Sequence, residues 1–216
     1  MKTFLLCFLC AGLIAAQAAN EEKPAPKKGA TPAPLTAPPE EIAHTYIRAM
    51  ADARMSVVAD VMHPGALERF KTILSGLADA IINAPADRRP PQRVIDALFG
   101  SQGPAALKQQ TPRDVFVGFM SNLTTFLPQV REMTAGSEYQ VLGHVDEGNL
   151  THVVFRATLR RGDAGLSKMS VLSLKRDGED WKVLLTDDLS DIIGTLGRGM
   201  LAPPSSAAAP QAPAGQ

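Results

Sequence analysis

The sequence contains little cysteine, few aromatic residues and no run of basic residues. The only two cysteines among its 216 residues are Cys7 and Cys10. A mature chain that begins after them has no disulfide, no thiolate nucleophile and no cysteine-bound zinc. The 22 basic residues balance the 22 acidic ones. Because no lysine- or arginine-rich segment stands out, nucleic acid is not an expected partner.

The first residues have the layout of a secretory signal. Lys2 precedes an uninterrupted apolar run from Phe4 to Ala16, and Ala16-Gln17-Ala18 matches the small-x-small cleavage pattern. The run is shorter than the roughly 20 apolar residues of a spanning helix. We therefore expect a signal peptide at 1–19 and a periplasmic or secreted mature protein, with membrane contact only through the transient signal.

Two segments lack the apolar residues that a folded core needs. Residues 20–39 are rich in proline and alanine and indicate a linker, and the uncharged residues 199–216 indicate a disordered tail. The residues from 40 to 198 are enough for one domain with its own core.

The first half of this domain carries helical signals. Apolar residues recur three and four positions apart, and prolines and glycines interrupt the pattern at His63-Pro64-Gly65 and again from 83 to 91. The expected helices are one that begins at Glu40, Val57–Met62 capped by Ser56, Leu67–Ile82, Val94–Phe99 ended by Gly100, and one that begins at Pro112 after a Thr111 cap.

From Tyr139 the apolar period changes to two, which predicts strands. The first hairpin is expected to turn near Glu147-Gly148. A two-residue turn there places His144 and His152 on opposite faces, so a paired metal site is not expected.

The second hairpin joins Ser167–Arg176 to Trp181–Thr186. A turn of either two or four residues keeps the apolar side chains on one face, namely Leu172, Leu174, Trp181, Val183 and Leu185. The acidic cluster Asp177, Glu179 and Asp180 is then interpreted as the turn, because it lacks the ligand spacing of a calcium loop.

The other face of the predicted sheet mixes apolar and polar residues. The valines expected there are Val141, Val145, Val154 and Val171, beside His152, Arg156 and Lys182. One interpretation is ordinary exposed valine, and the other is a homodimer formed sheet to sheet. After the last strand, Asp187, Asp188, Ser190 and Asp191 indicate the cap of a short final helix.

Three segments together resemble the nuclear-transport-factor-2-like, or ketosteroid-isomerase-like, superfamily. EEIAHTYIRAMADARMSVVADVMHPGALERF resembles its opening helices and His-Pro turn, VLGHVDEGNLTHVVFRATLRR its middle strands, and LKRDGEDWKVLL its late hairpin. The resemblance implies an α+β fold, with helices packed on a curved antiparallel sheet to form a cone that encloses a cavity. Residues 67–110 are longer than the usual connection and indicate a helical insertion.

The resemblance does not supply a catalytic set. The family's isomerases use an aspartate base with a tyrosine and a protonated acid, and no acid of this chain matches that motif. We therefore expect a non-catalytic exported domain that binds a small apolar ligand or a protein partner, without a cofactor or metal. The alternatives are an isomerase or dehydratase that uses the cavity, and a structural subunit of an envelope assembly. The candidate ligand-binding residues are Tyr46, His63 and Trp181.

Overall fold

The computed structural model describes residues 37–127, 137–161 and 164–201. The expected signal peptide, nearly all of the linker and most of the tail lie outside these residues. The elements run in the order α1 (Pro39–Ala51), α2 (Met55–Val61), α3 (Pro64–Ile82), α4 (Gln92–Phe99), the 3₁₀ helix η1 (Pro104–Gln109), α5 (Pro112–Phe126), β1 (Ser137–Glu147), β2 (Leu150–Arg161), β3 (Ala164–Asp177), β4 (Asp180–Val183) and α7 (Asp187–Leu201).

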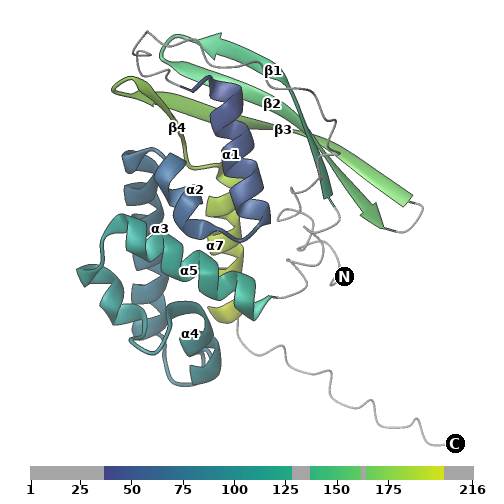
Figure 1. Ribbon diagram of the computed structural model, residues 1–216. Helices are drawn as coiled ribbons and strands as arrows, with labels where there is room; N and C mark the ends of the chain where they lie inside the picture. Colours follow the sequence, from purple (N-terminus) through teal and green to yellow (C-terminus); the bar gives the residue numbers. More distant parts are fainter. Residues whose placement is uncertain (1–36, 128–136, 162–163, 202–216) are drawn as a thin grey trace, which may run out of the picture.

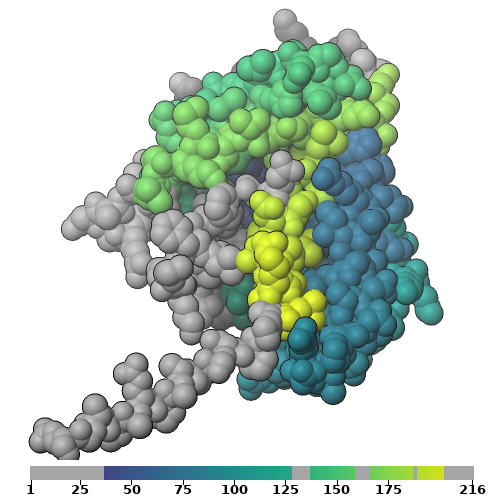
Figure 2. Space-filling model, turned by 180° about the vertical axis from the view of Figure 1, so that it is seen from behind, coloured from purple at the N-terminus to yellow at the C-terminus, as the bar shows by residue number. Residues whose placement is uncertain are grey.

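The predicted α+β class is confirmed. The four strands form one antiparallel sheet in the order β1-β2-β3-β4, and Figure 1 shows it as a curved layer above the helices. Helix α1 lies against this sheet, and α2, α3, α4 and α5 continue the helical part away from it (Figure 1). Helix α7 leaves the sheet after β4 and runs alongside α3 (Figure 2).

Helix α1 is suited to lie close to the sheet because its buried side includes small residues. Proline at its start and Glu40 and Glu41 in its first turn favour the helix, since carboxylates there complement the helix dipole. Ala43 and Ala49 are fully buried, and Ala43 lies on the same side of the helix as Ile47. The neighbours of α1 are α2 and the strands β1, β2 and β4.

The first hairpin turns one residue later than the sequence indicated. Glu147 pairs with Leu150, so Gly148 and Asn149 form the turn, and Gly148 has the positive φ of 60° that such turns require. His144 consequently pairs with Val153 and not with the expected Thr151. The predicted outcome for the two histidines is nevertheless confirmed: His144 and His152 lie on opposite faces of the sheet.

A β-bulge in β1 corrects one prediction. The register shifts between Val141 and Gly143, where the backbone of Gly143 has a φ of 145°. An inserted residue reverses the alternation of the strand beyond it. Val141 therefore shares the inner face with Phe155 and packs against the core, whereas Val145 lies on the outer face. The prediction that both valines lie outside was wrong for Val141.

The second hairpin confirms that the acidic cluster forms a turn. Asp177 pairs with Asp180, which leaves Gly178 and Glu179 as the turn, and Leu174 pairs with Val183. The pairing of Leu174 with Val183 is the register expected for the four-residue turn. The strands stay paired up to Asp177 and Asp180, so the turn itself has only two residues. The guanidinium of Arg176 lies 4.1 Å from the centroid of the Trp181 ring and also donates to the backbone carbonyl of Glu179.

The helices cover the part of the inner face that the second hairpin forms, as predicted. Val153, Leu172, Leu174 and Val183 are buried in one core together with α1, and Leu185 packs against that core. Leu174 and Val183 have no exposed surface at all. The helices therefore cover this part of the inner face completely.

The helical part has its own aromatic centre. The ring of Phe70 on α3 lies 5.0 Å from that of Phe116 and 6.0 Å from that of Phe119, both on α5, in edge-on geometry. Thr111 caps α5 as expected, because its hydroxyl accepts a hydrogen bond from the backbone N–H of Asp114 at 3.1 Å. The residues expected to form an insertion, 67–110, make up most of α3 together with α4 and η1.

Two helix boundaries differ from the predictions. Ser56 does not cap α2, because the helix begins at Met55 and Ser56 lies inside it. The final helix is not short: α7 has 15 residues and includes 199–201, which the sequence assigned to the tail. Both errors occur where the expected boundary depended on a single polar residue or on composition alone.

Candidate functional site

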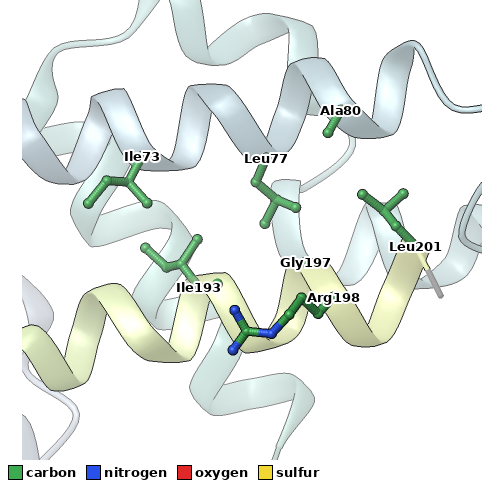
Figure 3. Close-up of a pocket in the computed structure, with 8 residues that line it drawn as sticks. Ile73, Leu77, Ala80, Ile193, Gly197, Arg198 and Leu201 are labelled. Carbon is green, nitrogen blue, oxygen red and sulfur yellow. The ribbon is translucent and has the colours of Figure 1, made fainter.

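A groove with a volume of about 470 Å³ runs along the seam between α3 and α7. Its wall on α3 consists of Ile73, Leu77 and Ala80. Positions three and four apart lie on one side of a helix, so these three side chains form one continuous apolar strip. Figure 3 shows Ile73 and Leu77 pointing from α3 towards α7.

The opposite wall of the groove belongs to α7. It consists of Ile193, Gly194, Gly197, Arg198 and Leu201, which again share one side of their helix. In Figure 3 the side chains of Ile193 and Leu201 point from α7 towards α3. The groove is open to solvent, and Arg198 contributes the one charged side chain among the residues that line it.

Two of the three glycines of α7 lie beside the groove and affect its packing. A Cβ atom at Gly197 would lie only 3.1 Å from Cδ1 of Leu77, so the backbone of α7 packs directly against that side chain. A Cβ atom at Gly194 would lie 3.5 Å from Nη1 of Arg198. The missing side chains therefore bring α7 close to α3 at Gly197 and leave room for the guanidinium of Arg198 beside Gly194.

The three candidate ligand-binding residues from the sequence do not line this groove. Tyr46 is buried on α1 within the core, and Trp181 lies half-buried on β4 beneath Arg176. His63 is the cap of α3: its Nδ1 accepts a hydrogen bond from the backbone N–H of Gly65 at 3.0 Å. The backbone N–H of His63 also donates to the carbonyl of Val183 at 2.8 Å, which joins the start of α3 to β4.

A polar cluster joins the start of α1 to the edge strand β1. Nδ1 of His144 donates a hydrogen bond to the carboxylate of Glu40, and Nε2 lies 3.8 Å from the carboxylate of Asp146. Thr151 donates to Asp146 from the neighbouring strand. The hydrogen bond from His144 lowers the pKa of Glu40, and the same bond raises the pKa of His144.

The other strand histidine belongs to a separate network on the outer face. His152 is hydrogen-bonded to the hydroxyl of Ser173 at 2.9 Å and to the carboxylate of Glu147 at 3.0 Å. Within residues 37–127, 137–161 and 164–201, no group of three or more His, Asp and Glu side chains is arranged to hold a metal ion. No helix in those ranges is both long and apolar enough to span a bilayer.

Comparisons with protein-family models, with curated proteins and with solved structures found no match to this chain. The geometry of the groove is therefore the basis for a functional assignment.

Sequence reasoning did not identify the groove because its two walls are far apart in the chain. Ile73 and Leu77 follow the apolar pattern of α3, and Ile193 follows that of the final helix, so each is predictable as part of an apolar helix face. The signal that was available is the pair Gly194 and Gly197 on the apolar side of a helix. Small residues at such positions permit close helix packing, but they do not specify the partner helix.

Proposed function

We propose that the protein is an exported, non-catalytic binding protein that holds a small apolar molecule in the groove between α3 and α7. The observation that carries this proposal is the groove itself, which has a volume of about 470 Å³ and is lined by isoleucine, leucine, alanine and glycine residues and one arginine. Binding sites for small molecules commonly have volumes of about 300–1,000 Å³ and predominantly apolar linings. The signal-like layout of residues 1–19 supports the export part of the proposal.

The family resemblance remains part of this proposal. The order of helices followed by a curved antiparallel sheet, with α1 against the inner face, supports a nuclear-transport-factor-2-like assignment. The binding site that we propose lies away from the sheet, in the seam between α3 and α7. In the part of the chain that the structure describes, no observation favours the isomerase alternative, since His63 caps a helix and Tyr46 lies in the core.

The proposal is tested by titrating the protein with the neutral ligand decan-1-ol and recording NMR spectra of its methyl groups. We expect shifts at Ile73, Leu77, Ile193 and Leu201, which belong to both walls of the groove. A tryptophan at the exposed groove residue Ala80 should fill the space, so Ala80→Trp should abolish these shifts.

Ala105→Trp is the matched control for this experiment. Ala105 is also exposed, and it lies on η1 and not in the groove. The control variant should bind decan-1-ol like the wild type. If the four methyl groups do not respond in the wild type, or respond equally in Ala80→Trp, the groove is not the ligand site.

A further inference from the structure

We infer that the ligand of the groove is an amphipathic carboxylate, with its apolar chain along the seam and its anionic head at Arg198. This inference rests on the proposed function, because it specifies the class of molecule that the same groove takes. It depends on the position, the hydrogen bonding and the surroundings of the one charged side chain in the wall.

The guanidinium of Arg198 lies beside the groove on the exposed side of α7. Its Nη2 donates to the hydroxyl of Thr195 at 3.0 Å, and its Nη1 lies over Gly194, one helical turn before Arg198. Figure 3 shows the guanidinium extending along α7 towards Ile193, at the end of the groove away from Leu201. Glycine at 194 makes this position available, since a larger residue would occupy part of that space.

Among the described residues, the hydroxyl of Thr195 is the one group that accepts a hydrogen bond from this exposed guanidinium. An arginine side chain has five N–H donors, and the hydroxyl of Thr195 accepts from one of the terminal nitrogens. Within the described ranges, no carboxylate forms an ion pair with Arg198, although other arginines of this chain do have such partners. The planar fork of arginine matches a carboxylate, to which it donates two parallel hydrogen bonds.

A basic residue in the last turn also stabilises a helix through its dipole, and Arg198 is such a residue in α7. That role is fulfilled by charge near the carbonyl end of the helix. Side chains of a helix lean towards its N-terminus, so the guanidinium of Arg198 lies beside Gly194 and the apolar groove. Arg198 therefore places a cation at the groove as well as near the end of the helix.

The remainder of the groove suits an unbranched apolar chain. The wall of α7 extends from Ile193 to Leu201, which is about 12 Å at 1.5 Å per residue. Leu77, Ala80 and Leu201 provide apolar surface along it, beyond the end where the guanidinium lies. A groove with an apolar wall and one cation at one end matches a medium-length alkyl carboxylic acid. The carboxylic acid is ionised at neutral pH and can pair with the cation.

The test compares decanoate with decan-1-ol, two ligands with the same chain and different heads, on the full protein at pH 7. We expect both to shift the groove methyl groups and decanoate to bind about tenfold more tightly, because hydrogen bonds to a charged group strengthen its binding. Arg198→Met should remove this preference, so that the ratio of the two affinities measured in the same variant falls to about one. The preference of the wild type should also decrease as the salt concentration is raised.

Two further variants make the result specific to Arg198. Arg198→Lys retains the charge without the fork and should keep part of the preference. Arg93→Met removes an exposed charge from α4, outside the groove, and should behave as the wild type.

The outcomes separate the inference from the proposed function. Equal affinity for the two ligands, or a preference that survives in Arg198→Met, would overturn the inference and leave an apolar-ligand site in place. Absence of binding by both ligands would overturn the proposed function and the inference with it.

Discussion

The two faces of the sheet carry similar apolar residues but differ in how far these residues are exposed to solvent. On the inner face Leu174 is 0% exposed, whereas Val145, Met169 and Val171 on the outer face are 61%, 60% and 53% exposed. Valine and leucine contribute to both faces, so residue type does not distinguish them. The difference is the cover: α1 and the elements packed with it remove the inner side chains from water. The contribution of an apolar side chain to stability therefore depends on the face on which it lies.

The largest effect is expected on the inner face. Leu174→Ala removes a fully buried side chain from β3, and such truncations lower the free energy of unfolding by about 2–5 kcal/mol. Val171→Ala, three residues earlier on the same strand, should change it by less than about 0.5 kcal/mol because its side chain is exposed. Urea denaturation of the two variants measures the contrast, and equal losses would contradict the described cover.

A second substitution at Val171 tests whether the outer face forms a homodimer. Val171→Lys should leave the stability of the isolated chain nearly unchanged for the reason just given. Sedimentation of this variant beside the wild type then decides between the two interpretations of the exposed valines. A wild-type dimer that dissociates in Val171→Lys would assign the outer face to the sheet-to-sheet homodimer that the sequence left open.

An intermediate effect is expected at the bulge that determines which face each residue of β1 occupies. Gly143 has a φ of 145°, which side-chain-bearing residues rarely adopt, so Gly143→Val should cost about 1–3 kcal/mol of unfolding free energy. The control is Gly76→Ala on α3, where a Cβ atom meets no other atom within 4 Å. That variant should retain the wild-type stability or gain up to about 1 kcal/mol. A harmless Gly143→Val would mean that the bulge is not required.

The smallest effect is expected for the hydrogen bond between Glu40 and His144, which joins α1 to the inner side of β1. The pKa of His144 is raised from its ordinary value of 6.5, so its contribution is fully present below the unfolded-state pKa and is lost as pH rises through the folded pKa. The pKa of Glu40 is lowered, so its contribution is lost as pH falls through that lowered value. The pair stabilises the fold most between these two limits.

An NMR titration of the His144 imidazole checks this pair directly. Glu40→Gln removes the charged acceptor, and the titration midpoint of His144 should then fall towards 6.5. The imidazole of His152, hydrogen-bonded to Ser173 and Glu147 on the outer face, serves as the reference in both proteins. An unchanged midpoint for His144 in Glu40→Gln would show that the bond does not form in solution.

Local signals were sufficient for most elements of the fold. Pro112 after Thr111 predicted the start of α5, and Gly100 predicted the end of α4, because each satisfies a backbone requirement of its own segment. The inner face of the second hairpin followed from strict alternation, which does not depend on the exact length of an even turn. These features require information from only a few neighbouring residues.

The errors and the candidate site depend on distant parts of the chain. The bulge at Gly143 has no pattern in β1 that predicts it, because it is defined by the register against β2. His63 caps α3 through a local bond from Gly65, but its backbone bond to Val183 of β4 is not indicated by any local pattern. In each case the missing information was the identity of a neighbour in space.

The sequence by itself determined the expected helices, the two hairpins and the apolar face of the second one, because propensity, capping and alternation act over a few residues. The tertiary structure alone decided that Val141 lies on the covered face of the sheet and that Leu77 meets Gly197. It also placed the guanidinium of Arg198 beside an apolar groove between two helices more than a hundred residues apart in the chain. These contacts could not be predicted from the sequence because they arise from close packing between distant segments of the chain. No local sequence pattern specifies which segments will pack together.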